Sequence, residues 1–354
     1  MKPLTVCVTG VGGGGNGEQL LKALRLADTP YRVVGTDMSP LSAGLNMVDI
    51  PVLLPPATDP TYIDALLETC RKHEVRTLLP GSEPELCVIS EHRDAIMSQG
   101  IFLPLNPPDV IALCMDKLKM FESLAGMNVE VPWFRRIHNE EDVASFPQFP
   151  VVYKPSVGSG GSANTFIVQN EDEARWFARH LLALYPEFIA QEYVGTPEDE
   201  YTVGVLSDMD GHFINSIAVR RFVLSALGSS IKLPNRTGRS ELGQQLVISS
   251  GISQGDIGPF PNVTGPCEEI AKLLGSCGPF NIQCRLVNGK IYIFEINPRF
   301  SGTSSLRALA GFNEPDILIR HHVLGEEIKA RFPYREGVIM RHLEEAFVDD
   351  IPRL

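Results

Sequence analysis

The sequence has little of several features that mark particular classes of protein. It contains no run of about 18 apolar residues, the length that a transmembrane helix requires. Basic residues are in deficit, since 31 Lys and Arg face 43 Asp and Glu and the formal net charge is −12. Proteins that bind nucleic acids or anionic membranes need clustered Lys and Arg side chains. The composition therefore predicts neither a nucleic-acid partner nor a membrane partner.

Paired cysteines are also lacking. The cysteines are dispersed, odd in number and free of any C-x-x-C pair; they are Cys7, Cys70, Cys87, Cys114, Cys267, Cys277 and Cys284. This distribution predicts reduced thiols, most of them in the core. The N-terminal apolar stretch reaches glycine too early for a secretory signal peptide, so we expect a cytoplasmic location.

The chain is long enough for two or three lobes. Up to about residue 108, strand-like and helix-like segments alternate, which predicts a parallel α/β domain. A helix is predicted over 109–126, and an α+β body follows it. Asn288-Gly289 between two apolar runs predicts a β-hairpin. The polar, Gly- and Ser-rich stretch 229–258 is interpreted as a mobile loop over a site.

The glycine-rich segment that begins at Gly10 fits G-x-G-x-x-G, and Asp37 lies well downstream of it. One interpretation is a dinucleotide site, in which the glycines approach a phosphate and Asp37 binds a ribose. A second is that glycine only makes the tight turn from strand to helix. A third is that the loop holds the carboxylate or phosphate of an acceptor substrate. These alternatives remain open at the level of sequence.

Lys154 ends an apolar strand and precedes a segment of small residues that includes Ser159, Gly160 and Gly161. The backbone N–H groups of such a loop can close over a polyphosphate, and a cation beside the loop can bind the same anion. The segment is not a Walker A loop, because no G-K-[ST] follows the glycines.

A linker strand follows at 189–194, and its backbone groups can face the edge of an adenine ring. A carboxylate just beyond such a strand can accept hydrogen bonds from both ribose hydroxyls. For Glu198 and Asp199 we prefer a solvated acidic turn.

Four polar residues occupy the predicted hairpin near residue 290. Gln283 and Glu295 lie on its two arms, and Asn297 and Arg299 follow Glu295 at alternate positions. Alternate residues of a strand share a face, so these side chains are expected to converge. Oxygen ligands from Glu, Asn and Gln suit Mg²⁺, with Mn²⁺ as an alternative ion. Arg299 could neutralise charge on a transferring phosphoryl group.

Together these segments resemble the ATP-grasp superfamily, and within it the ATP-binding unit of the carbamoyl phosphate synthetase large subunit and its stand-alone relatives. The resemblance covers nearly the whole chain. Its most specific marks are E-I-N-P-R-F-S-G and the upstream N-I-Q, and C-M-D-K-L-K-M-F-E-S-L also matches. It implies a Rossmann-like pre-ATP-grasp domain (1–108), a linker helix with a lid subdomain (109–195) and a C-terminal ATP-grasp subdomain with the metal site (196–354).

The resemblance also assigns roles to individual residues. Those implied to bind ATP are Lys117 and Lys154 at the phosphates, the 157–162 lid with Ser159, Gly160 and Gly161, the adenine hinge Glu192, Tyr193 and Val194, and the ribose-binding Glu200. Those implied at the reacting centre are the metal ligands Gln283, Glu295 and Asn297, with Arg299 assisting phosphoryl transfer. A further basic group is expected before the hairpin, and we assign it to Arg221 rather than Arg220. Gln283 replaces a common Glu, which weakens one of two metal positions.

The activity implied by the resemblance is ATP-dependent ligation. A small-molecule carboxylate is activated as an acyl phosphate and attacked by an amine or other nucleophile, with release of ADP and phosphate. A homodimer is kept as one candidate state, in which a second subunit completes the acceptor site. Three alternatives are kept: phosphorylation of bicarbonate or carbamate as in carbamoyl phosphate synthetase, a non-catalytic nucleotide-binding protein, and an NAD-dependent enzyme.

Several histidines and one cysteine that could be taken for site residues are assigned structural roles. Adjacent histidines on a helix point about 100° apart, so His321 and His322 make a poor metal pair, and His342 has no partner pattern. Cys284 alternates with Gln283 and is expected to face the core.

Overall fold

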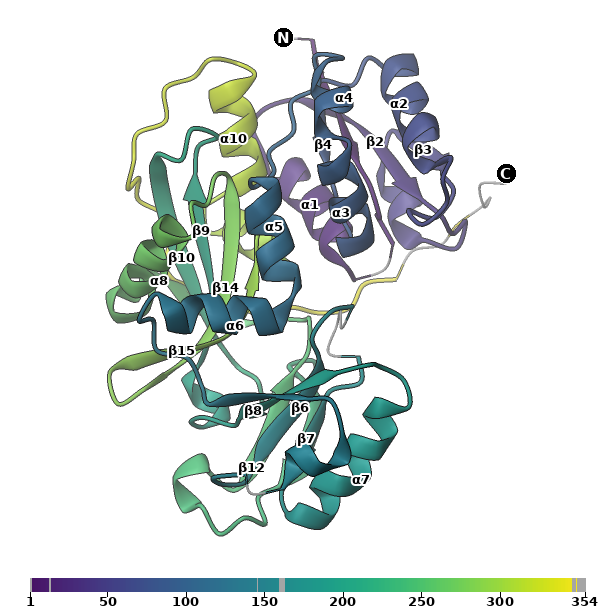
Figure 1. Ribbon diagram of the computed structural model, residues 1–354. Helices are drawn as coiled ribbons and strands as arrows, with labels where there is room; N and C mark the ends of the chain where they lie inside the picture. Colours follow the sequence, from purple (N-terminus) through teal and green to yellow (C-terminus); the bar gives the residue numbers. More distant parts are fainter. Residues whose placement is uncertain (1, 13, 145, 159–162, 346–347, 349–354) are drawn as a thin grey trace.

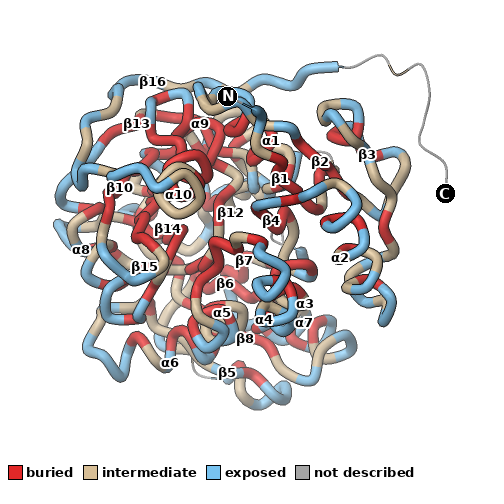
Figure 2. Tube along the Cα trace, turned by 90° about the horizontal axis from the view of Figure 1, so that it is seen from above, coloured by how far each residue is buried: buried red, intermediate tan, exposed pale blue. Residues whose placement is uncertain are grey.

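The computed structural model describes residues 2–12, 14–144, 146–158, 163–345 and 348. It contains an N-terminal domain, a small lobe and a large lobe, with two helices at their junction (Figure 1). Buried residues gather along the strands of all three bodies, and exposed residues follow the outer loops and helices (Figure 2). In the part of the chain that is described, no helix has both the length and the apolar character to cross a membrane.

The N-terminal domain is the predicted parallel α/β unit. Its sheet has the strand order β3-β2-β1-β4 and parallel pairing throughout. The strands are β1 (Leu4–Val8), β2 (Tyr31–Asp37), β3 (Ile50–Leu53) and β4 (Thr77–Leu79), and the helices are α1 (Asn16–Arg25), α2 (Tyr62–Lys72), α3 (Glu83–Glu91) and α4 (Arg93–Met97). Parallel strands align their carboxyl ends, so the glycine loop after β1 and the turn after β4 meet at one edge.

The predicted helix over 109–126 is wrong at its centre, because the structure has two helices, α5 (Pro108–Met115) and α6 (Lys117–Gly126). Asp116 between them is extended, and its Oδ1 accepts hydrogen bonds from Leu118 N at 3.1 Å and Lys119 N at 3.2 Å. An aspartate in this position caps the new helix. The Lys117 N–H then donates to Ser156 O at 2.9 Å, which ties α6 to the small lobe.

The small lobe is an antiparallel sheet with the strand order β5-β8-β6-β7 and a core of its own beneath α7 (Glu171–Leu182). Its strands are β5 (Phe134–Ile137), β6 (Val151–Pro155), β7 (Phe166–Val168) and β8 (Phe188–Glu192). Half of the predicted loop 229–258 forms strands instead. Two of them, β11 (Ser229–Pro234) and β12 (Gln245–Ser249), pair with each other and pack on the small lobe through Leu242, Leu246 and Tyr193. The alternating burial of β11 places its apolar residues on one face, a period that the Gly and Ser content obscures.

The large lobe is a six-stranded sheet with the order β15-β14-β9-β10-β13-β16. Its strands are β9 (Glu200–Ser207), β10 (Phe213–Arg221), β13 (Gly255–Gly258), β14 (Pro279–Val287), β15 (Lys290–Asn297) and β16 (Gly337–Ile339), and its helices are α8 (Pro261–Leu273), α9 (Ser304–Leu309) and α10 (Glu314–His322). The β14–β15 hairpin forms as predicted. Asn288 and Gly289 both have positive φ, as a two-residue hairpin turn requires.

The N-terminal domain and the large lobe share one hydrophobic core. Leu20 and Leu24 of α1 belong to the same buried cluster as Ile217, Phe312 and Leu318. Helix α1 contacts both α9 and α10. The two bodies are therefore joined by packing as well as by the chain, while the small lobe has a core of its own.

Candidate active site

A cavity of about 970 Å³ lies where the three bodies meet. Its volume is at the upper end of the range for small-molecule sites. The N-terminal domain contributes Gly14, Gly15, Asn16, Gly81, Glu83, Pro84 and Cys87. The remaining wall includes Lys117, Lys154, Gln191, Glu192, Tyr193, Val194, Glu200, Arg221, Gln283, Arg285, Glu295, Asn297 and Arg299. Every described residue that the sequence assigned to the site therefore lines this cavity; Ser159, Gly160 and Gly161 lie outside the described residues.

The candidate metal ligands stand at the end of the β14–β15 hairpin. Gln283 and Glu295 are cross-strand partners, and the Gln283 amide Nε2 donates to Glu295 Oε2 at 2.7 Å. Asn297 follows on β15 and is buried. Its Oδ1 accepts a hydrogen bond from Arg299 Nη2 at 3.0 Å. The hairpin thus presents three oxygen-bearing side chains to the cavity from two neighbouring strands.

Three cations surround Glu295. Lys117 Nζ lies 3.6 Å from Glu295 Oε1. Lys117 is the first residue of α6, so the helix break at Asp116 sets the position of its side chain. Burial raises the pKa of Glu295, but Lys117, Lys154 and Arg299 outweigh it, so the pKa falls below its ordinary value. The carboxylate is therefore ionised at neutral pH and able to bind a cation.

Lys154 is buried at the end of β6, and its Nζ donates to Phe294 O at 2.8 Å. Burial and the nearby Lys117 lower its pKa to about 7, although Glu295 acts in the opposite direction. An amine with this pKa gains a proton readily when an anion arrives.

Arg299 joins the hairpin to the N-terminal domain. Its Nη2 lies 3.0 Å from Asn297 Oδ1 and 3.0 Å from Glu83 Oε1. Glu83 begins α3, and no sequence pattern had singled it out. This ion pair joins the large lobe to the N-terminal domain at the cavity, so a residue of the first domain stands beside the candidate metal ligands.

Glu200 lies between two arginines on the cavity wall. Arg221 Nη1 donates to its Oε1 at 3.0 Å, and Arg285 Nη2 donates to its Oε2 at 3.1 Å. All three side chains are buried, and the group has one net positive charge. Arg220, the alternative to Arg221, is half exposed and pairs with Asp256 outside the cavity.

Arg285 was missed by sequence reasoning. Its guanidinium lies over the Tyr193 ring at 4.5 Å and donates to Val194 O at 3.0 Å, so it supports the linker strand from behind. A signal existed, because Arg285 follows Gln283 by two residues and shares its strand face.

The linker strand is held by its neighbours. The Glu192 N–H donates to Trp133 O at 2.7 Å, and its carboxylate accepts hydrogen bonds from Gln148 and Trp133. Tyr193 directs its hydroxyl to Val247 of β12, where it accepts from the Val247 N–H at 2.8 Å. Gln191, which precedes the linker, is buried in the cavity wall, and its Oε1 has no hydrogen-bond partner among the described residues.

The N-terminal glycine loop faces the same cavity through Gly14 and Gly15. Asp37 does not point outward to a ribose. Its Oδ2 accepts a hydrogen bond from Gly12 N at 2.7 Å, and its Oδ1 accepts one from Ser39 N at 3.0 Å. This use of Asp37 disfavours the dinucleotide interpretation and leaves the loop as part of the cavity wall.

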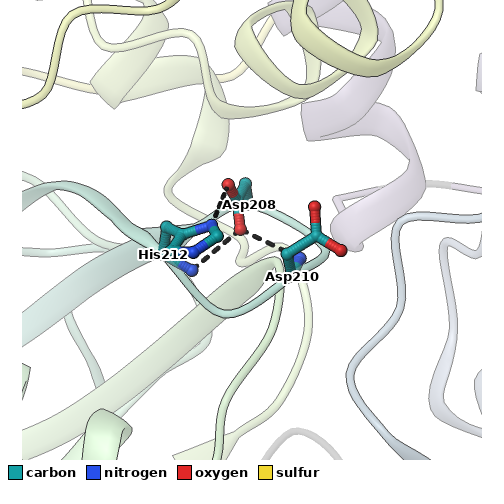
Figure 3. A group of neighbouring side chains, drawn as sticks. All are labelled: Asp208, Asp210 and His212. Atoms are coloured by element: carbon teal, nitrogen blue, oxygen red, sulfur yellow. Dashed lines mark hydrogen bonds and ion pairs between the residues drawn. The ribbon is translucent and has the colours of Figure 1, made fainter.

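A separate group, Asp208, Asp210 and His212, stands at the β9–β10 turn (Figure 3). Asp208 Oδ1 accepts hydrogen bonds from Asp210 N at 2.9 Å and His212 N at 2.8 Å, and Oδ2 meets His212 Nδ1 at 3.0 Å. These contacts are those of an aspartate that closes a turn. Behind it, His322 Nε2 accepts a hydrogen bond from Met209 N at 3.1 Å, in keeping with the expected structural role.

Comparison with known proteins gives matches at both ends of the chain. Residues 10–103 match the family model of the PylC-like N-terminal domain. Residues 249–346 match the model of an ATP-grasp protein in the biosynthetic pathway with the Ter operon. Over 263 residues the chain is 27% identical to the carbamoyl phosphate synthase large chain of Thermoplasma acidophilum, a stretch that covers 71% of this chain and 23% of that protein. The chain thus spans about a quarter of the length of this curated relative.

Solved structures share the whole architecture. An ADP complex of N5-carboxyaminoimidazole ribonucleotide synthetase matches with a TM-score of 0.63 and 18% identity, over 96% of this chain and 80% of that one. An L-amino acid ligase from Bacillus licheniformis matches with a TM-score of 0.61 and 17% identity, over 91% and 74%. The shared architecture and the two family models agree with the sequence resemblance: the chain has the ATP-grasp fold, preceded by a PylC-like N-terminal domain.

Proposed function

We propose that the chain is an ATP-dependent ligase that activates a small-molecule carboxylate as an acyl phosphate for attack by an amine or another nucleophile. The observation that carries the proposal is the meeting of Lys117, Lys154 and Arg299 around Glu295 at one end of a large cavity. Polyphosphate needs several cations, and its metal ion needs an anionic oxygen ligand beside them. Both requirements are met within one cluster.

The residues of the hairpin fit a magnesium ion. Glu295 is held ionised, and Asn297 and Gln283 add amide oxygens, which is the ligand type that Mg²⁺ or Mn²⁺ prefers. Gln283 now presents its NH₂ to Glu295, and half a rotation of the amide presents its oxygen instead. When bound, the ion would screen the charge of the β- and γ-phosphates.

The other residues of the cavity are proposed to bind ATP or to assist phosphoryl transfer. Lys117 and Lys154 bind phosphate oxygens, and the backbone of Glu192, Tyr193 and Val194 borders the adenine. Glu200 offers its remaining lone pairs to ribose. Arg299 stabilises the charge that develops as the carboxylate oxygen attacks the γ-phosphorus, with Arg221 as a second cation at the wall. The attack is in line and needs no covalent intermediate on the protein.

Two alternatives concern the same cavity. Bicarbonate or carbamate could take the place of the carboxylate, as in carbamoyl phosphate synthetase, or the protein could bind nucleotide without turnover. The cations around Glu295 favour turnover, because a binding site alone has no need of Arg299 beside the ligands. Substrate dependence separates all three.

The test is ADP release with Mg·ATP and a panel of amino acids, small carboxylates and bicarbonate, each alone and paired with amines. We expect carboxylate-dependent turnover that falls at least about 100-fold in Glu295→Gln, which keeps the shape of the side chain and removes its charge. Glu130→Gln is the matched control, because Glu130 is exposed and, within the described part of the chain, forms its ion pair with Lys290 alone. Nucleotide binding without turnover would support the non-catalytic alternative, and failure to bind ATP would refute the proposal.

A further inference from the structure

The cavity extends beyond the nucleotide residues to a wall built by the N-terminal domain. Among the described residues of that wall, Glu83 is the only carboxylate, and neither lysine nor arginine occurs there. Cys87 lies one helical turn after Glu83, and burial together with the Glu83 charge raises its pKa, so its thiol is neutral. The wall therefore has a single negative charge.

Among the described residues, the other basic side chains of the cavity lie apart from this wall or are already paired: Lys117 and Lys154 lie beside Glu295, and the three arginines are held in ion pairs. Arg221 and Arg285 are both engaged by Glu200, and Arg299 is engaged by Glu83 itself. By sequence, Gly13 and the segment 159–162 have no ionisable side chain. A phosphorylated substrate on this wall would meet a carboxylate instead of the cations that phosphate requires. The wall fits a neutral or cationic group.

Arg299 relates this wall to the reacting centre. Because its Nη2 lies 3.0 Å from both Asn297 Oδ1 and Glu83 Oε1, Glu83 stands one guanidinium away from the candidate metal ligands. Glu83 is 30% exposed, and among the described residues its Oε2 has no hydrogen-bond donor. If the carboxylate of a substrate binds beside Arg299, this Oε2 of Glu83 is close enough to accept a hydrogen bond from another group of the same substrate.

We propose that the activated carboxylate belongs to an α-amino acid whose ammonium group is bound by Glu83. In an α-amino acid the ammonium nitrogen and the carboxylate carbon share one carbon atom, so the two charges match the neighbouring Arg299 and Glu83. This inference rests on the proposed function and narrows it, since it excludes bicarbonate and phosphorylated carboxylates. In the reaction a carboxylate oxygen attacks the γ-phosphorus, the bond to the β–γ bridging oxygen breaks, and ADP leaves.

The experiment traps the acyl phosphate with hydroxylamine, so that the natural nucleophile need not be known. The hydroxylamine nitrogen attacks the carbonyl carbon, phosphate leaves, and the hydroxamate is measured as its ferric complex. Each common amino acid is assayed alone with Mg·ATP, and the best one is compared with its 2-hydroxy and unsubstituted acids. We expect kcat/KM for the amino acid to exceed that of the unsubstituted acid by about 100-fold or more.

Glu83→Gln tests the residue. If Glu83 binds the ammonium group, the preference for the amino acid over the unsubstituted acid falls toward unity. If Glu83 only orients Arg299, both substrates lose activity equally and the ratio is unchanged. Glu91→Gln, on the same helix and exposed, is the control expected to keep the wild-type ratio.

The substrate preference of the wild-type protein tests the inference even if Glu83→Gln fails to fold. Hydroxamate formation that is as fast with the unsubstituted acid would overturn the inference and leave the ligase proposal intact. Faster ADP release with bicarbonate or a phosphorylated carboxylate would do the same. Absence of ATP turnover with every carboxylate would instead remove the ligase proposal on which the inference rests.

Discussion

At the scale of single residues, Lys154 couples the site to pH. Burial and Lys117 hold its pKa at about 7, so the amine loses its charge as the pH rises above neutrality. Bound phosphate favours the charged form and raises the pKa again. On the proposed role of Lys154 at the phosphates, binding of ATP above pH 7 takes up a proton on Lys154, and binding below that pH does not.

We predict that the affinity for Mg·ATP falls between pH 7.5 and 9 by up to about tenfold per pH unit, the limit for uptake of one proton. Below about pH 6.5 the affinity should no longer change with pH through Lys154, because the amine is already charged. Titration calorimetry in buffers of different ionisation enthalpy measures the proton uptake directly. Lys154→Arg is the matched variant, since arginine stays charged throughout and should bind without proton uptake. A wild-type affinity that is flat over this range would contradict the prediction.

At the scale of elements, strand β9 depends on a glycine. A Cβ atom at Gly204 would lie 2.5 Å from Arg307 Nη1 and 2.8 Å from Glu314 Oε1. Arg307 and Glu314 form a fully buried pair, and Arg307 Nη2 also donates to Asn281 Oδ1 at 2.7 Å. The flat guanidinium packs directly on the strand, where no side chain fits.

Gly204→Ala should therefore lower the free energy of unfolding by about 3 kcal/mol, the cost of forcing apart a buried ion pair. Urea denaturation measures the change. Gly126→Ala at the exposed end of α6 is the control, because a Cβ atom there meets nothing within 4 Å. That substitution should stabilise the protein by roughly 0.5 to 1 kcal/mol. A neutral Gly204→Ala would mean that the pair moves freely.

Local sequence patterns predicted some elements and not others. The β14–β15 hairpin was predictable because Asn288-Gly289 has one favoured turn and the strands alternate around it. The break at Asp116 was not, because α5 and α6 bury apolar residues on both sides of it and the spacing of apolar residues along the sequence continues across the break. The cap becomes decisive only when Ser156 accepts the Lys117 N–H from another lobe.

At the scale of the whole molecule, Asn106 fastens the N-terminal domain to the large lobe. Its Nδ2 donates to Pro279 O at 2.7 Å and to Pro298 O at 3.1 Å. Its Oδ1 accepts from Ser276 Oγ at 2.9 Å and from Cys277 N at 3.0 Å. The side chain is fully buried, and all four of its hydrogen-bonding positions are used.

Asn106→Ala should cost about 3 kcal/mol or more of unfolding free energy, since it leaves several buried polar groups without partners. Because Pro298 precedes Arg299, ADP release should also decline below the unfolding transition. Asn262→Ala, on the exposed first turn of α8, should change stability by less than about 0.5 kcal/mol. Thermal unfolding and activity on the same samples check both effects. An Asn106→Ala protein with wild-type stability would show that the shared core alone joins the domains.

The residues of the candidate site also divide into those that the sequence could predict and those that it could not. Residues that share the hairpin, such as Glu295, Asn297 and Arg299, could be grouped from sequence because a strand places alternate residues on one face. Glu83 could not, because it lies 216 positions from Arg299 and reaches it through the docking of the N-terminal domain on the large lobe, to which the packing of α1 and the hydrogen bonds of Asn106 both contribute. Long-range docking of this kind leaves no periodic trace in a single sequence.

The two walls of the cavity belong to separate stretches of the gene. Residues before Asn106 form the wall with Glu83, and the hinge, the hairpin and the paired arginines all come after it. On the proposed function, mutations in the first stretch would alter which molecules are joined while the use of the nucleotide is inherited unchanged. Exchange of the first stretch between related genes would then offer an evolutionary route to new products, limited mainly by whether the incoming segment restores the contacts of Asn106 and α1.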